Sequence, residues 1–235
     1  MAIISKFLNT VKQNTQLPVI FTTAFCFAYI LFSLVLYFCN GFHFIHGIIA
    51  WNLFLAALPL VFSVLADFAI KSGRKALAVM AGILWLLFFP NSPYLITDII
   101  HLHIFDYYGM SGYVRNISEW VWLMYMSVGI LLGVVTGMMS LELFYQRIVQ
   151  RKGRGVAYSA ILAVVIISGY AIYIGRFLRL NSWDIIRPWF LVQKLVKNID
   201  SFAVAFSLSM SVCILLVYVL FHAFFSNSAK LSKSQ

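Results

Sequence analysis

The sequence predicts an all-α membrane protein built as a bundle of six transmembrane helices. Of its 235 residues, 63% are hydrophobic and only 10% are charged, and the mean hydropathy is +0.93. A water-soluble domain typically carries about 25% charged residues and about 45–50% apolar residues. Five apolar runs reach the roughly 20 residues that a helix needs to cross a bilayer, and a sixth does so across an internal break. The composition therefore excludes a soluble globular protein.

The expected spans divide the chain into three regions. Residues 1–18 form an amphipathic segment, in which apolar residues at helical spacing oppose Lys6 and Lys12, as is typical of a helix on a membrane surface. The transmembrane domain is expected at residues 19–225 and a short tail at residues 226–235. No small-residue cleavage site follows the first span, which is therefore expected to be retained as an anchor. The expected spans cover residues 19–39, 48–70, 76–105, 121–144, 156–175 and 202–225.

Basic residues predict the orientation of these spans. The net charge is +10, from 17 Lys and Arg residues and seven Asp and Glu residues. Eleven of the bases fall on the side that carries both termini, and short cytoplasmic loops are enriched in Lys and Arg. Both termini are therefore expected in the cytoplasm, and no nucleic-acid partner is expected. Five of the six remaining bases crowd into the loop between the last two spans, namely Arg176, Arg179, Arg187, Lys194 and Lys197.

The third span is interrupted by the tetrapeptide Pro90-Asn91-Ser92-Pro93. The helix before it rises only about 21 Å at ~1.5 Å per residue, so the break should fall inside the membrane. Ser92 before Pro93 suits the N-cap of a restarted half-helix, whose free N–H groups and positive dipole end would hold an anion. A proline kink without a ligand is the alternative. The candidate binding residues of this segment are Asn91, Ser92 and Tyr94.

Asp98 and His101 lie three residues apart on the expected half-helix and share a face. A carboxylate that fixes the tautomer of an imidazole makes a general base, and the same pair can ligate a metal ion. Asp98 and His101 are therefore the candidate catalytic residues, and together with Asp184 they are candidate ligands of a divalent metal ion. An ordinary hydrated helix end is the alternative. No other cofactor is indicated, because the sequence has no Walker loop, zinc-protease helix or dinucleotide fingerprint.

The second polar segment follows the fifth span. Arg176 comes about 30 Å along that span, near the expected level of Asp98, and Arg179 lies one turn further on the same face. Two guanidinium groups at this spacing suit a phosphate or a carboxylate, whereas snorkelling arginines at the interface are the alternative. Six spans with cytoplasmic termini place both segments on the extracytoplasmic face. The candidate substrate-binding residues are Arg176, Arg179, Asn181, Trp183 and Asp184, joined by Asn52 from the second span.

Small residues and boundary charges are expected to hold the helices together. Gly129, Gly133 and Gly137 repeat every four residues on the fourth span, a pattern that lets helix backbones approach closely. Their partner is expected within the chain, and oligomerisation through these glycines is the alternative. Asp67 and Glu142 are expected to form boundary ion pairs, with Lys71 and Arg147 respectively. The three cysteines show no metal-binding spacing and are interpreted as small hydrophobic residues.

The polar segments resemble signature blocks of the domain-of-unknown-function 1361 family. The resemblance implies a bacterial multi-pass protein of the plasma (inner) membrane, and it implies no established activity. The residues that carry it are Pro90-Asn91-Ser92-Pro93-Tyr94 with Thr97, Asp98 and His101; Gly175-Arg176-Phe177 with Arg179 and Asn181-Ser182-Trp183-Asp184; and Trp51-Asn52 with Pro59.

Three functions stay open on the sequence, all with membrane lipid as a partner. The first is an enzyme that acts at the extracytoplasmic face on a phosphorylated lipid or a lipid-linked glycan. In it His101 would be the general base or a metal ligand, Asp98 would orient His101, and Arg176 with Arg179 would clamp the anion. The second is a transporter or flippase of an anionic substrate that uses the broken helix as its binding element. The third is a non-catalytic membrane partner subunit, in which the polar groups only lock helices together.

Overall fold

The computed structural model describes residues 13–39, 44–110, 112–178, 189 and 197–231. Within these ranges, six helices are long and apolar enough to cross a membrane, which confirms the predicted fold class. The spans are Leu17–Cys39, Phe44–Lys71, Lys75–Ile104, Ile117–Lys152, Arg154–Leu178 and Ser201–Phe225.

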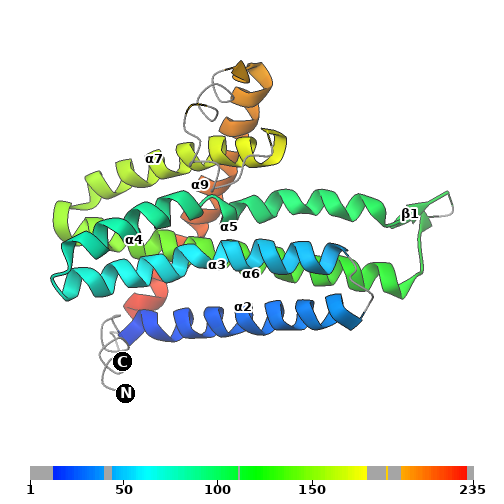
Figure 1. The fold of residues 1–235 in the computed structure, drawn as a ribbon, viewed down its shortest axis with the longest axis horizontal. Coiled ribbons are helices and arrows are strands. Elements are labelled where there is room, and N and C mark those ends of the chain that lie inside the picture. Colours follow the sequence, from blue (N-terminus) through cyan, green and yellow to red (C-terminus); the bar gives the residue numbers. More distant parts are fainter. Residues whose placement is uncertain (1–12, 40–43, 111, 179–188, 190–196, 232–235) are drawn as a thin grey trace.

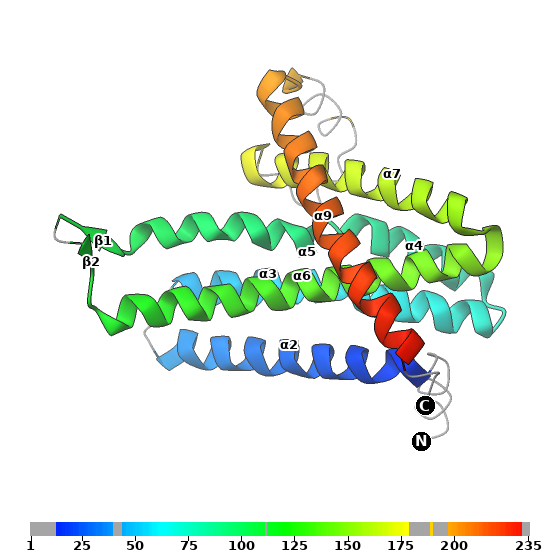
Figure 2. The same cartoon turned by 180° about the vertical axis from the view of Figure 1, so that it is seen from behind.

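Four of the spans run side by side along the long axis of the molecule (Figure 1). They are α2 (Gln13–Cys39), α3 (Phe44–Lys71), the third span that begins with α4 (Lys75–Phe88), and α6 (Ile117–Lys152). The next helix, α7 (Arg154–Tyr173), packs against α6, and α9 (Ser201–Leu231) packs against α7. Seen from behind, α9 crosses the other helices at a steep angle (Figure 2).

The two ends of the bundle differ in chemistry. A two-stranded antiparallel hairpin, β1 (Tyr108–Gly109) and β2 (Gly112–Tyr113), extends beyond the helices at what we call the hairpin end (Figure 1). The opposite end, which we call the basic end, also holds the beginning of α2 and the end of α9. It is defined by the bases around the α3–α4 and α6–α7 turns, which are Lys71, Arg74, Lys75, Arg151, Lys152 and Arg154.

Two glycines make the tight turns at the basic end. Gly73 lies between α3 and α4 with a φ of 72°, and Gly153 alone separates α6 from α7 with a φ of 86°. A side chain at either position would be strained in this left-handed conformation. Both turns therefore hold antiparallel neighbours close together at this end.

The third span is interrupted where the prolines predict, although the chain keeps its direction. After α4 come α5 (Asn91–Tyr94) and η1 (Leu95–Ile104), a 3₁₀ helix. The predicted Ser92 N-cap with free N–H groups is wrong, because the N–H groups of Ser92 and Tyr94 donate to the carbonyls of Phe89 and Pro90 at 3.1 and 3.0 Å. The Ser92 hydroxyl instead donates to the carbonyl of Ala56 in α3 at 2.7 Å. The N–H groups of Ser92 and Tyr94 thus have partners within the span, as backbone donors in lipid require.

The glycine ladder of α6 packs inside the chain. A Cβ atom added at Gly129, Gly133 or Gly137 would come closer than 3.0 Å to a side chain of another span. These neighbours are Tyr29 of α2, Leu95 of η1 and Ser92 of α5. The within-chain partner is therefore observed, and contact between two copies of the chain stays a prediction.

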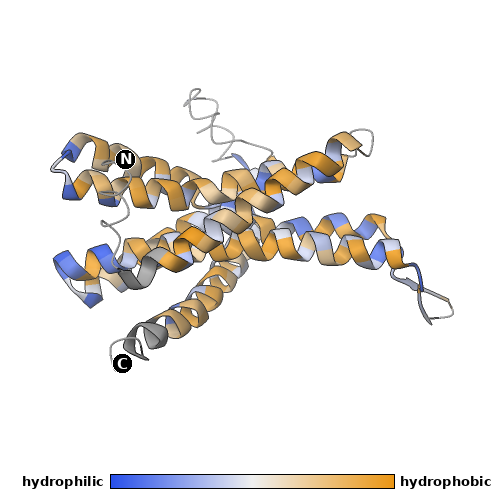
Figure 3. Cartoon of the chain, turned by 90° about the horizontal axis from the view of Figure 1, so that it is seen from below, coloured by the Kyte–Doolittle hydropathy of each residue, from blue (hydrophilic) through white to orange (hydrophobic). Residues whose placement is uncertain are grey.

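Hydrophobic residues make up most of the long helices, as the orange ribbons in Figure 3 show. Large exposed hydrophobic residues occur on every long span, for example Phe25, Ile83, Leu131, Ile166 and Leu216. Such a surface suits contact with lipid tails, which are as apolar as leucine. Association of the helices then depends on close packing and on polar contacts between them, and not on apolar burial.

The domain boundaries expected near the two ends of the chain stay predictions. The amphipathic pattern before the first span lies in residues 1–12, outside the described residues. At the other end, α9 continues to Leu231, beyond the expected end of the transmembrane domain at residue 225.

Candidate functional site

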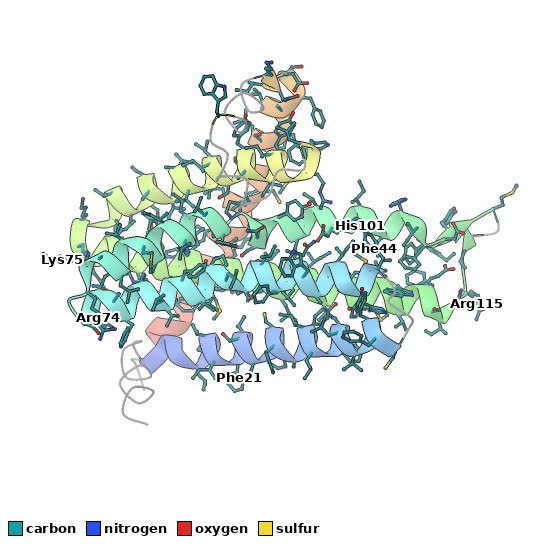
Figure 4. All side chains as sticks on the ribbon, viewed as in Figure 1. Phe21, Phe44, Arg74, Lys75, His101 and Arg115 are labelled. Carbon is teal, nitrogen blue, oxygen red and sulfur yellow. The ribbon has the colours of Figure 1, made fainter. Side chains whose placement is uncertain are left out.

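A buried carboxylate lies at the centre of the polar cluster in the hairpin half of the bundle. The side chain of Asp98, in η1, is only 3% exposed. Its Oδ2 accepts a hydrogen bond from Asn52 Nδ2 of α3 at 2.7 Å, and its Oδ1 accepts one from Arg176 Nη2 at 2.6 Å. Asp98 thus ties three spans together through one side chain. Figure 4 labels the neighbouring His101 on the same segment, between Arg115, which lies between the hairpin and α6, and the turn with Arg74 and Lys75.

Arg176 reaches this carboxylate from η2 (Ile174–Leu178), a π-helical turn at the end of α7. Its Nε donates to Thr97 Oγ1 at 3.0 Å, Nη2 also contacts that hydroxyl, and the guanidinium carbon lies 4.4 Å from the centre of the Tyr94 ring. An aromatic face attracts a cation at this separation. Within the part of the chain that the structure describes, Nη1 makes no hydrogen bond. Among the described residues, the hydrogen bonds of this guanidinium thus come from Nε and Nη2.

His101 lies beside the ion pair and reaches the surface. Its Nε2 is 3.8 Å from Asp98 Oδ1, and its side chain is 31% exposed. This separation exceeds a hydrogen bond of about 3.2 Å, so a proton would pass between the two groups through one water molecule or after a small movement. The predicted Asp98–His101 pair is thus adjacent, with the carboxylate buried and the imidazole partly exposed.

Two departures from α-helical geometry position these side chains. The 3₁₀ helix η1 has three residues per turn, so residues i and i+3 lie in line, which places His101 directly above Asp98. The same spacing allows the Thr97 hydroxyl to donate to the carbonyl of Tyr94 at 2.7 Å, while its oxygen accepts from Arg176. The π-helical turn η2 carries Arg176, and such turns occur often at functional sites.

The predicted site residues fall into three groups. Asn52, Tyr94, Asp98, His101 and Arg176 come together in this cluster. Asn91 and Ser92 serve the backbone instead, since Asn91 Nδ2 donates to the carbonyl of Phe88 at 2.9 Å and Ser92 packs against α3 and α6. The candidates outside the described residues are Arg179, Asn181, Trp183 and Asp184.

A metal ion at this cluster would need ligands beyond the pair. Among the residues whose placement is described, no group of three or more His, Cys, Asp or Glu side chains gathers in one place. Both oxygens of Asp98 already accept hydrogen bonds, one of them from a cation, and this arrangement disfavours a second cation at the carboxylate. A metal bound by Asp98 and His101 would need further ligands, and Asp184, the third predicted ligand, lies outside the described residues.

Two features escape the analysis of the sequence. Thr97 accepts from Arg176; the sequence places it in the block that carries the family resemblance but assigns it no role in the site. The second feature is a buried polar cluster around Glu142 of α6. Its Oε2 lies 2.7 Å from His222 Nδ1 and accepts from the Tyr218 hydroxyl at 3.1 Å. The sequence signal is a polar pair four residues apart, Tyr218 and His222, inside an apolar span.

One of the two expected boundary ion pairs is present, and the other is not. Lys71 Nζ lies 2.9 Å from Asp67 Oδ2, as the sequence predicts. Arg147 does not pair with Glu142; its Nε donates to Asp67 Oδ1 at 3.1 Å, and its Nη2 donates to the carbonyl of Ser63. The two residues point to different neighbours because they lie five positions apart on α6, more than one full turn.

A comparison with known protein families identifies the family of this chain. Residues 51–217 match the family described as "Protein of unknown function (DUF1361)". The chain belongs to the DUF1361 family. The DUF1361 region contains Asn52, Tyr94, Asp98, His101 and Arg176, and thus the whole cluster. No curated protein and no solved structure matches this DUF1361 chain.

Proposed function

We propose that this multi-pass DUF1361 protein is a membrane enzyme whose site at the hairpin end acts on a phosphorylated lipid or a lipid-linked glycan. The observation that carries the proposal is the buried Asp98–Arg176 pair with the half-exposed His101 imidazole 3.8 Å from its carboxylate. Ionisable side chains inside a membrane segment are costly, and where they occur they generally mark a site. By the positive-inside rule this end faces away from the cytoplasm.

Each residue of the cluster has a role in this proposal. Arg176 Nη1 holds a phosphate oxygen, because guanidinium groups bind phosphate well and the other nitrogens are held by Thr97 and Asp98. Asp98 fixes the orientation of Arg176 through the hydrogen bond from Nη2 to Oδ1. His101 exchanges a proton with the reacting group at the rim, where it is accessible.

An apolar groove at the same end of the bundle suits the apolar part of such a substrate. The groove, of about 690 Å³, runs between α2 and α3 at the hairpin end. Its lining includes Leu34, Phe44, Phe54 and Trp51, the residue that precedes Asn52. A polyprenyl or acyl chain in the groove would keep the phosphate at the level of Asn52. The groove supports a lipid substrate over a soluble one.

Binding is tested with a polyprenyl phosphate and the corresponding polyprenol, added to the purified full-length protein in detergent. The phosphate should raise the melting temperature more than the alcohol does, and the difference should disappear in the variant D98N/R176Q. This double change keeps the net charge and leaves no unpaired ion. Equal stabilisation by phosphate and alcohol would refute the anion site.

Catalysis is tested with His101→Gln, which removes the proton-transfer group and leaves Arg176 in place. We expect H101Q to keep phosphate-dependent stabilisation and to convert a bound lipid-linked substrate about 10²–10⁴-fold more slowly, followed by mass spectrometry. His103→Gln is the matched control, because His103 is exposed and its Nδ1 lies 2.5 Å from the carbonyl of Ile100 in η1. Equal rates in H101Q and the wild type would refute the enzyme.

One observation favours a non-catalytic partner subunit as the second candidate. Both oxygens of Asp98 are hydrogen-bonded across spans, as a purely structural lock requires. In that case D98N/R176Q would lower the amount of folded protein without any phosphate-specific effect. The transporter alternative loses support, because the N–H groups that it assigned to a restarted half-helix are already bonded.

A further inference from the structure

A second cavity, of about 290 Å³, lies at the basic end between α3, α4 and α6. Its walls are apolar, with Ala66 and Ile70 from α3 and Ala78 and Gly82 from α4. Its floor is formed by Trp85 and Phe144, whose rings stack at 4.2 Å. The wall is open at Gly82, where an added Cβ atom would meet nothing within 4 Å.

Three cations from α6 line this apolar cavity, namely Arg147, Arg151 and Lys152. Arg147 is partly neutralised, because Asp67 accepts from it and also pairs with Lys71. Arg151 and Lys152 are exposed and form no ion pair within the described part of the chain. The cavity therefore has an uncompensated positive rim around an apolar interior.

We propose that this cavity binds an anionic phospholipid of the adjoining leaflet, with its phosphate on Arg151 and Lys152 and the start of one acyl chain against Gly82. The positive-inside rule explains bases anywhere at this end, but it does not place three of them around one apolar cavity. Basic pockets between transmembrane helices are a recurring form of anionic headgroup site. The volume is near the lower limit of ligand pockets, about 300 Å³, so it holds only this part of the lipid. The site lies at the opposite end from Asp98 and does not depend on the proposed enzyme.

The test uses full-length protein in nanodiscs or detergent, with phosphatidylglycerol and phosphatidylcholine of identical acyl chains as probes. Lipid retention by native mass spectrometry and the lipid-dependent rise in melting temperature are measured for each variant against its own lipid-free baseline. Arg151→Gln with Lys152→Gln should weaken phosphatidylglycerol binding about thirtyfold, the effect of two bases at about 1 kcal/mol each. Gly82→Leu, which fills the cavity without touching a charge, should also weaken it.

The matched control neutralises two other exposed bases of the same end, Lys75→Gln with Arg154→Gln, which do not line the cavity. It should retain phosphatidylglycerol at the affinity of the wild type. An equal loss in this control would show a diffuse surface charge effect, and equal binding of phosphatidylcholine would show an unselective groove. Either result overturns the proposal, as would full affinity in G82L or competition by millimolar inorganic phosphate alone.

Discussion

At the scale of single residues, the cluster concentrates its charge on one buried carboxylate. Asp98 accepts from Asn52 and Arg176, and the Tyr94 ring covers the guanidinium at 4.4 Å. Removing one partner of a buried ion pair leaves the other charge uncompensated, which costs more than the pair itself contributes. We therefore expect the contributions of Asp98 and Arg176 to the stability of the protein to be coupled.

The first prediction is strong coupling between Asp98 and Arg176. Asp98→Asn alone and Arg176→Gln alone should each reduce the free energy of unfolding by about 3–5 kcal/mol, because each leaves a buried charge. D98N/R176Q should cost less than either single change. Reversible unfolding in mixed micelles measures the cycle, with H101Q as a control of small effect; additive single costs would contradict the coupling.

The second prediction concerns Glu142, which accepts from Gln146 and Tyr218 and contacts His222. Glu142→Ala should lower the free energy of unfolding by about 1–3 kcal/mol, because it leaves the buried hydroxyl of Tyr218 without its acceptor. Glu142→Gln, which keeps an acceptor oxygen, should cost less. Asp106→Asn, at an exposed position, serves as the neutral comparison. Equal stability of E142A and D106N would show that the cluster contributes nothing.

At the scale of elements, helix irregularities and small residues position the cluster. The 3₁₀ helix η1 aligns Asp98 with His101, and the π-helical turn η2 carries Arg176 to them. The third span can approach α6 closely because Gly133 and Gly137 leave room for Leu95 and Ser92. Packing at the glycines thus determines the position of η1 and, with it, the position of Asp98.

The third prediction tests this packing with alanine at two glycines. Gly137→Ala should lower the free energy of unfolding by about 1–3 kcal/mol, because its methyl group would collide with Ser92. Gly82→Ala should have no such cost and should gain about 0.5–1 kcal/mol, since the position is helical and open. Melting temperatures of the two purified variants make the comparison. A G137A protein as stable as G82A would show that α5 and α6 are not in close contact.

At the scale of the whole molecule, the bundle is polarised along its long axis. Bases gather around the α3–α4 and α6–α7 turns, and aromatic side chains gather near the hairpin, where Phe105 and Trp122 stack at 5.3 Å. Aromatic residues favour the membrane–water interface, and Lys and Arg favour the cytoplasmic side. The basic end is therefore expected in the cytoplasm.

The fourth prediction is the orientation of the two ends. In a variant with Cys26, Cys39 and Cys213 replaced by alanine, a membrane-impermeant thiol reagent should label Met110→Cys at the hairpin end of intact cells. Arg154→Cys, at the basic end, should react only after the cells are permeabilised. Labelling of R154C alone in intact cells would reverse the orientation and would place the Asp98 cluster on the cytoplasmic side.

In the candidate site, the height of a residue along its helix could be predicted from the sequence, but its bonding partner could not. Asp98 and Arg176 could be placed at one level, because the rise of each helix from its basic end is a simple function of residue number. The role of Ser92 could not be predicted, because its partner, the carbonyl of Ala56, belongs to another helix. Arg147 likewise binds Asp67 of α3, and Glu142 contacts His222 of α9; both partners belong to other helices and could not be predicted either.

The sequence by itself determined that the chain lies in a membrane, how many spans it has and roughly where each begins and ends. It also placed the two polar segments at the same end of the bundle. These properties depend on local hydrophobic length and on charge counts, which need no knowledge of neighbouring helices. Only the tertiary structure decided which polar groups meet, because partner choice depends on the rotation and close approach of packed helices. In lipid those are set by glycine contacts and interhelical hydrogen bonds, and apolar patterning does not encode them.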